Sequence, residues 1–361
     1  MIDPIIEQSA QVISGIVSDF RSGEIEPLTP KDVHAFVEQC DVISPMSSVE
    51  KRLFVAGLAS ALARSYWSID KIRAEMSRLI PGVRSDDVTF LYMQETRSSQ
   101  GHLLGVLDAN EEQSFPFTLF VAPSAISFRL GSNTVVDEST STTYLYIDDA
   151  TYTGKTLAKY LVQIKELMRN KILQGKRLVV WHLIEFQDAA RTSIDPIVEA
   201  MREMGVSVEL SRVRSASASV GGMSSVQVLL PRQSLRENEI VKRLFSRKTD
   251  RLRAVWSNPE PWRMSNVQDD GLFESPEQRD VVERVLLEVG CSLILRTKEW
   301  NSLMRPLGFV SSGKDHSLGF GSFFCTCFNS SNNSPLALWW GDPKMTGTAL
   351  ANWKPLLPRR V

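Results

Sequence analysis

The stretch Tyr144-Leu-Tyr-Ile-Asp-Asp-Ala-Thr-Tyr-Thr-Gly-Lys-Thr-Leu157 decides how this chain is expected to fold. Its first four residues are the aromatic and aliphatic types that favour a buried strand. Beyond the turn, apolar residues recur at the spacing of a helix, at Leu157, Tyr160, Leu161, Ile164 and Met168. The stretch therefore predicts a strand, a tight turn and a helix, with two acids where the strand ends.

The turn after the two acids has the properties of an anion site. The first backbone N–H groups of a helix are unpaired and point toward one position in front of it. Thr153 and Thr156 add hydroxyl donors, and Gly154 lets the backbone approach a ligand closely. Asp148 and Asp149 would repel a phosphate unless a polyol or a metal ion lay between them. A ribose 5-phosphate meets both conditions.

Two other interpretations of the turn have to be weighed. Gly154-Lys155-Thr156 ends the Walker pattern G-x-x-x-x-G-K-[ST], but that pattern needs glycine at the position of Asp149. An ordinary strand-to-helix turn with a helix cap is the second alternative. Two adjacent acids followed by T-G-K-T favour a binding site over both.

The run Asp148 to Thr156 resembles the phosphoribosyl pyrophosphate (PRPP) loop of the type I phosphoribosyltransferases, whose pattern is two acids, two or three variable residues, and T-G-x-T. The resemblance implies an α/β fold with a mainly parallel sheet flanked by helices. It implies that Asp148 and Asp149 are the catalytic acids, which hold the ribose hydroxyls and contact Mg²⁺ indirectly through its waters. The 5-phosphate would be bound by Tyr152, Thr153, Gly154, Lys155 and Thr156.

The resemblance also bears on the acceptor of the phosphoribosyl group. Purine-salvage members of that family carry a carboxylate at the position of Tyr152, where it acts as the base toward the purine. Pyrimidine-linked members carry other residues there. Tyr152 therefore argues against purine transfer and leaves the acceptor open.

Two further loops of such an enzyme have candidates here. Residues 95–101 follow the expected strand Val88 to Met93, and the pyrophosphate would meet Arg97, Ser98, Ser99 and Gly101. A plain polar connection is the alternative. Residues 129–136 occupy the place of the loop that closes over the site in this family.

A base is expected near the loop after the strand Arg177 to Ile184. Phe186 would stack on the base and Asp188 would bond an amino or imino group. His182, inside that strand, is expected to be a satisfied core residue rather than a catalyst.

The chain is expected to divide into a helical N-terminal extension (1–85), a phosphoribosyltransferase-like α/β domain (86–235) and a small α+β C-terminal region (236–361). Ser47 with Glu50 predicts a capping box in the first region. In the last, Ser275 and Pro276 predict the start of a helix that ends before Gly290.

Composition excludes few classes of function. The formal charge of −1 gives no general attraction to nucleic acid or anionic membrane, and no apolar run is long enough to span a bilayer. The cytoplasm is the default location. The four cysteines are expected to be reduced and buried, and Cys325-Thr-Cys327 is not expected to bind metal.

One basic cluster, Lys242 to Trp262, interleaves cations with tryptophans, which is a pattern able to grip single-stranded nucleic acid. A solvated helix face is the favoured interpretation.

The segment 318–340 contains Asn332, Asn333, Trp339 and Trp340. It resembles, more loosely, the C-terminal segment of phosphoribosyltransferase-like proteins from bacterial conflict and antiphage gene neighbourhoods. That resemblance implies partner proteins of a defence operon. Self-association stays open.

The leading hypothesis is a phosphoribosyltransferase-like protein that binds PRPP with Mg²⁺ and transfers or hydrolyses the phosphoribosyl group, as an effector in antiphage defence. The alternative is a non-catalytic module that senses PRPP or a nucleotide.

Overall fold

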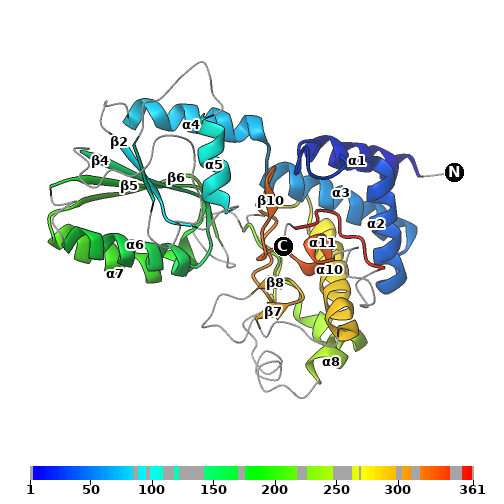
Figure 1. Ribbon diagram of the computed structural model, residues 1–361. Helices are drawn as coiled ribbons and strands as arrows, with labels where there is room; N and C mark the ends of the chain where they lie inside the picture. Colours follow the sequence, from blue (N-terminus) through cyan, green and yellow to red (C-terminus); the bar gives the residue numbers. More distant parts are fainter. Residues whose placement is uncertain are drawn as a thin grey trace. The chain divides into compact units, whose positions relative to one another are not determined.

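The computed structural model describes residues 3–83, 88–94, 98–108, 118–121, 142–169, 175–217, 226–246, 262–267, 270–297, 303–309, 318–341 and 352–359. The chain forms two compact units, one from residues 69–216 and one that combines residues 1–68 with 217–361. Figure 1 shows the elements of both.

The unit 69–216 is built on a five-stranded sheet in the order β3-β2-β4-β5-β6, and every pair in it is parallel. The strands are β2 (Val88–Tyr92), β3 (Thr118–Val121), β4 (Thr143–Thr151), β5 (Arg177–Phe186) and β6 (Ser207–Ala216). This confirms the predicted parallel α/β fold. The chain reverses its direction across the sheet between β2 and β4, and in such sheets the crevice for ligands opens at that point.

Four helices cover this sheet, with α4 (Ile69–Val83) and α5 (Ser99–Asp108) on one face and α6 (Lys155–Arg169) and α7 (Gln187–Glu203) on the other (Figure 1). The stripe predicted on α6 packs on the sheet, because Leu157, Leu161 and Ile164 are buried against Tyr146 and Val180. The core between the sheet and α6 and α7 thus fixes where the turn before α6 stands.

Two strands are longer than the sequence suggested. β4 continues to Thr151, so both acids lie inside the strand, paired with β5 through Thr151 and Glu185. β5 continues to Phe186 and α7 begins at Gln187, so the expected base loop is a strand end followed directly by a helix. Pairing with a long neighbour supplies the backbone hydrogen bonds that extend each strand.

The other unit joins the two ends of the chain. Its N-terminal helices are α1 (Pro4–Ile16), α2 (Pro30–Ile43) and α3 (Ser48–Ser65). The elements that follow residue 216 are η3 (Gln233–Glu237), α8 (Glu239–Phe245), α10 (Pro276–Arg296), β7 (Met304–Arg305), β8 (Gly308–Phe309), β9 (Cys325–Thr326), β10 (Asn329–Ser330) and α11 (Leu336–Trp339). β1 (Tyr66–Trp67) pairs in parallel with β9, which pairs antiparallel with β10.

The predicted three-part division therefore needs correcting. Residues 1–68 and the C-terminal region form one unit rather than two, because β1 pairs with β9 and α3 packs on α10, where a Cβ on Gly57 would lie 2.7 Å from Val282. α4 belongs to the α/β unit, so that unit begins at Ile69. It ends at Ala216 rather than near residue 235.

α10 is the buried centre of this second unit, and Ser275 caps it as predicted by accepting from Gln278 N–H. The capping box of Ser47 and Glu50 on α3 is confirmed as well. The expected end of α10 at Gly290 is wrong, since the helix continues to Arg296. Gly290 instead allows close packing, because a Cβ there would lie 2.4 Å from the Pro306 carbonyl oxygen.

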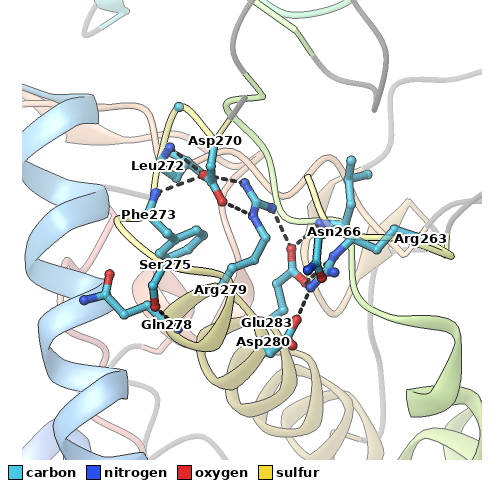
Figure 2. A network of polar contacts seen from close by, with 12 residues as sticks. Arg263, Asn266, Asp270, Leu272, Phe273, Ser275, Gln278, Arg279, Asp280 and Glu283 are labelled. Atoms are coloured by element: carbon cyan, nitrogen blue, oxygen red, sulfur yellow. Dashed lines mark hydrogen bonds and ion pairs between the residues drawn. The ribbon is translucent and has the colours of Figure 1, made fainter. Parts of the chain in front are cut away.

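A network of charged side chains, centred on the buried Arg263, Arg279 and Glu283, joins the segments that pack on α10 (Figure 2). Arg279 donates to Glu283 one turn away and to Asp270, and Arg263 donates to Glu283 and Asp280. Glu283 also accepts from the backbone N–H of Leu230 at 2.9 Å. Removing a charged side chain from water costs free energy, and ion pairs and hydrogen bonds such as these offset that cost.

All four cysteines are buried free thiols, and burial raises the pKa of Cys40 and Cys291. None of the helices in the described ranges is both long and apolar enough to cross a membrane.

Candidate functional site

The two acids lie at the end of β4, beyond the part of that strand that pairs with β2. The β2 pairing reaches only to Leu145, opposite Phe90, so β4 from Tyr146 onward extends past its last pair with β2. Asp148 is buried and Asp149 is half-buried. Both acids therefore lie on β4, next to the point where the order of the strands reverses.

Four donors surround the carboxylate of Asp148. Its Oδ1 accepts from Ser99 Oγ at 2.5 Å and from the backbone N–H of Asp149 at 2.9 Å. Its Oδ2 accepts from Gln94 Nε2 at 2.5 Å and from the Tyr146 hydroxyl at 3.1 Å. Asp148 is thereby bonded to both flanks of the connection from β2 to α5.

A second glutamine organises those flanks. The Oε1 atom of Gln100 accepts from the backbone N–H groups of Met93 and Gln94, and its Nε2 donates to the Leu91 carbonyl at 2.7 Å. Gln100 is fully buried. The sequence analysis did not predict a role for Gln94, Gln100 or Tyr146. Their hydrogen bonds depend on the tertiary structure, and no periodicity or motif in the sequence indicates them.

Burial and the neighbouring charge of Asp148 raise the pKa of Asp149 to about 8. His182 lies beside Asp148 on β5, and burial lowers its pKa to about 4. Its Nε2 has no hydrogen-bond partner among the residues that the structure describes, so the expected satisfied core histidine has one unsatisfied ring nitrogen. Asp148 and His182 are thus buried side by side at this end of the sheet, with the half-buried Asp149 next to them.

The turn that follows the acids is shaped by Gly154. Its φ is +70°, and a Cβ there would lie 2.5 Å from the Ala190 carbonyl oxygen on α7. Glycine is therefore required twice, once for the backbone conformation and once for the contact with α7. α6 starts at Lys155, with Lys155 and Thr156 exposed and Tyr152 and Thr153 half-buried.

Tyr152 and Phe186 stack on each other, with ring centroids 5.2 Å apart and an interplanar angle of 14°. Phe186 is fully buried at the end of β5. The side chain predicted to stack on a base is thus packed against Tyr152 within the protein. Asp188 lies in the first turn of α7, and its side chain is outside the described part.

Glu185 forms a charged group that the sequence did not predict. Its carboxylate is 6 % exposed and forms ion pairs with Arg191 of α7 at 2.8 Å and Arg212 of β6 at 3.3 Å. Glu185 pairs in register with Thr151, the last residue of β4. The end of β5 therefore carries a fixed array of charges next to the turn.

The profile of the PRTase-CE family matches residues 31–359 of the sequence. This chain belongs to that family of phosphoribosyltransferase-like proteins. Among solved structures it is similar to a phosphoribosyltransferase from Corynebacterium diphtheriae, at 13 % identity over 50 % of this chain and 96 % of that one, with a TM-score of 0.26. A score this low supports no transfer of residue roles. No curated protein matches the sequence.

The loop expected to receive pyrophosphate in this PRTase-CE chain is partly described. Ser98 caps α5 by accepting from Gly101 N–H at 3.4 Å, and Ser99 is turned toward Asp148. A Cβ on Gly101 would lie 2.9 Å from the Tyr92 hydroxyl. Arg97 and residues 129–136 lie outside the described residues.

No group of three or more His, Cys, Asp or Glu side chains able to hold a metal occurs in the described ranges. The residues present are the two adjacent carboxyl groups of Asp148 and Asp149. Mg²⁺ in phosphate-handling proteins is held by one or two carboxylates together with substrate oxygens and water. The site of this PRTase-CE protein therefore fits a metal ion that arrives with a phosphorylated ligand.

The basic cluster predicted outside the α/β unit is described only at its ends. Lys242 forms ion pairs with Glu237 at 3.0 Å and Glu239 at 3.6 Å, and Trp262 is buried. Residues 247–261 lie outside the described part. Binding of nucleic acid there remains a prediction.

The C-terminal segment with the paired asparagines and tryptophans forms contacts within its own unit. Asn333 Nδ2 donates to the Phe309 carbonyl at 3.3 Å, and Trp339 Nε1 donates to the Ser334 carbonyl at 2.8 Å. These bonds hold the turn before α11.

Proposed function

We propose that this PRTase-CE chain is a cytoplasmic protein that binds PRPP with Mg²⁺ and transfers or hydrolyses its phosphoribosyl group. One observation carries the proposal: two adjacent acids at the end of β4 and the start of α6 flank the same turn, at the point where the strand order reverses. A ligand that has hydroxyl groups at one end and a phosphate at the other can contact the acids and the start of α6 at the same time.

The phosphate end is supported by the shape of the turn. Gly154 brings the backbone close, and Thr156 and Lys155 lie in the first turn of α6, where unpaired N–H groups favour an anion. The helix dipole adds about 0.3–1 kcal/mol for a negative group at this position. The side chains of Thr153 and Thr156 can donate to phosphate oxygens.

The ribose end is supported by the acids, since a carboxylate accepts from two neighbouring hydroxyls without needing a charged partner. Bound Mg²⁺ would neutralise charge on the departing pyrophosphate. The chain's own contribution is to hold the sugar still while the bond between its anomeric carbon and the pyrophosphate oxygen breaks.

Isothermal titration calorimetry with PRPP and MgCl₂ tests the binding step. We expect wild-type protein to bind and Asp149→Asn to lose at least tenfold in affinity, the scale of one hydrogen bond to a charged group. The control is Asp195→Asn, an exposed acid on α7 with an ion pair to Arg191. Wild-type protein that does not bind PRPP would contradict the proposal.

A second candidate, a module that senses PRPP or a nucleotide without chemistry, has one observation in its favour. Tyr152 occupies the position where a base catalyst is expected, and its ring is packed on Phe186. Incubation with PRPP, Mg²⁺ and a panel of nucleobases separates the two, because only an enzyme releases pyrophosphate. Binding without release would favour the sensor.

An effector role in antiphage defence rests on the likeness of the segment 318–340 to C-terminal segments of conflict-system proteins. Plaque counts on bacteria that express wild-type protein or Asp149→Asn test it together with its genomic neighbours. Equal plaque counts for the two would contradict an effector role of this site.

A further inference from the structure

The last described segment of the chain, residues 352–359, packs on the unit that the two chain ends form. This C-terminal strap contains no helix or strand. Its side chains Trp353, Leu356 and Leu357 are nonetheless at most 4 % exposed. The strap therefore buries its apolar side chains as a bound peptide does, against residues that come from other parts of the chain.

Helix α2 holds the beginning of the strap mainly through the strap's backbone. Gln39 Oε1 accepts from the Lys354 N–H at 2.9 Å, and Gln39 Nε2 donates to the Lys354 carbonyl at 3.4 Å. One side-chain amide thus bonds both main-chain groups of one residue, as a neighbouring strand would. The ring of Trp353 packs edge-on against Phe36, with centroids 5.8 Å apart.

The end of the strap is held in the same manner by the segment that contains β10 and α11. The Leu357 N–H donates to the Leu338 carbonyl at 2.7 Å, and the Leu357 carbonyl accepts from Ser330 Oγ at 2.8 Å. The Arg359 guanidinium lies over the ring of Trp339, 5.7 Å from its centroid. Main-chain hydrogen bonds combined with burial of selected side chains are the means by which many proteins bind peptides.

Two features oppose this docking. Arg21 donates from Nη1 to the Pro358 carbonyl at 2.9 Å, and it is the one non-glycine residue in the described ranges with a positive φ, of 49°. The buried Trp353 Nε1 has no hydrogen-bond partner within those ranges. A left-handed backbone and an unpaired buried donor both cost free energy. Part of the free energy of docking is therefore offset at the contact itself, which favours a strap that can leave.

We propose that the unit formed by the two chain ends carries a peptide-binding site and that the C-terminal strap is its resident ligand. The ligand is a short peptide with a buried aromatic residue followed three and four positions later by leucine, as in Trp353 to Leu357. While the strap is docked, the site is closed to other peptides of this kind. The residues that contact the strap and define the site are Arg21, Phe36, Gln39, Ser330, Leu338 and Trp339.

The test uses the full-length protein with a protease recognition sequence introduced within residues 342–351 and cleaved after folding. We expect the cleaved strap to stay bound during gel filtration and to be replaced by an excess of fluorescent synthetic peptide with the sequence of residues 352–361. Uncleaved protein should bind that peptide at least tenfold more weakly, because a tethered ligand has a high effective concentration.

Variants of the cleaved protein locate the peptide. Gln39→Ala removes two hydrogen bonds to the strap and should weaken peptide binding roughly fivefold to hundredfold. Its matched control is Gln8→Ala, an exposed residue on α1, which should leave the affinity unchanged.

Gly341→Ala tests the same contact from outside the strap. A Cβ on Gly341 would lie 2.9 Å from the Trp353 carbonyl oxygen and 2.8 Å from Pro355 Cδ, so peptide binding should weaken. Gly15→Ala is the control, because the space around its Cβ position is open.

Several results would overturn the inference. One is a cleaved strap that does not exchange, and another is a protein that loses its circular dichroism signal when the strap leaves, since either makes the strap part of the core. Unchanged affinity in both Gln39→Ala and Gly341→Ala, or equal binding of a scrambled peptide, would place the peptide elsewhere. None of these measurements involves PRPP, so the proposed function is tested separately.

Discussion

Arg279 and Glu283 lie one turn apart on α10, with Arg279 Nη1 2.7 Å from Glu283 Oε1, and neither side chain is more than 1 % exposed. Glu283 is also the acceptor for Arg263, whose side chain is 2 % exposed. One buried carboxylate thus serves two buried guanidinium groups (Figure 2). Burial raises the pKa of Glu283, while the two arginines oppose that shift.

Glu283→Ala is expected to destabilise the protein by about 3–5 kcal/mol, because it leaves two buried cations without their shared partner. Urea unfolding of the full-length variant measures the change. The matched control is Glu274→Ala, an exposed residue just before α10, which should change stability by less than about 0.5 kcal/mol. Equal effects at the two positions would contradict this role for Glu283.

Gly154→Ala is expected to weaken PRPP binding and to destabilise the α/β unit by more than the ~1 kcal/mol that a positive φ alone costs. The added cost arises from the contact with the Ala190 carbonyl oxygen. Gly175→Ala is the control, since Gly175 has a φ of +73° and open space around its Cβ position. Thermal unfolding should show a clearly larger loss for Gly154→Ala.

Stability is expected to fall as pH rises from 6.5 to 9, through Asp149. Its folded pKa of about 8 lies above the unfolded value near 4, so the folded state keeps a proton that the unfolded state has lost. Stabilisation from this group is complete below pH 4 and is lost as pH rises to about 8, by at most ~1.4 kcal/mol per unit.

His182 is neutral in the folded state throughout this range, since its pKa is lowered to about 4. Its unfolded pKa of about 6.5 adds an opposing rise in stability that is nearly complete by about pH 7.5, and both proteins share that rise. Unfolding temperatures of wild-type protein and Asp149→Asn should therefore diverge across this range, with the wild type losing more. Parallel curves would show that Asp149 does not carry the shift.

Tyr152→Leu is expected to lower stability by about 0.5–1.5 kcal/mol through loss of the ring stack on Phe186. Tyr152→Phe keeps the stack and should change stability less. If the ring only packs, Tyr152→Phe should bind PRPP like wild-type protein; a loss of affinity in Tyr152→Phe, which keeps the stack, would assign a task to the hydroxyl. Calorimetry on the two variants separates these roles.

The local elements around the site were predictable because each depends on residues close together in sequence. Strand-forming residues before Asp148, helical spacing from Leu157 and a glycine in the turn suffice to predict strand, turn and helix. The length of β4 was not predictable, since Asp148 and Thr151 at its end are polar and are held in the strand by pairing with β5.

The same limit explains the missed site residues. Gln94 and Tyr146 become significant only when the sheet brings β2 beside β4, 54 positions separating Gln94 from Asp148 in the chain. The role of a polar side chain in a strand cannot be predicted before its hydrogen-bond partner is known. Glu185 is a similar case, because its partners Arg191 and Arg212 lie on a helix and a strand that follow it.

By itself, the sequence determined the strand, the two acids, the glycine turn and the amphipathic helix, because local spacing and backbone preference specify them. Only the tertiary structure decided that Asp148 accepts from Gln94, Ser99 and Tyr146, because these donors come from separate parts of the chain that the sheet brings together. The tertiary structure also decided that the two ends of the chain form one unit. The strands β1 and β9 are only two residues long, and each is a strand because it pairs with the other.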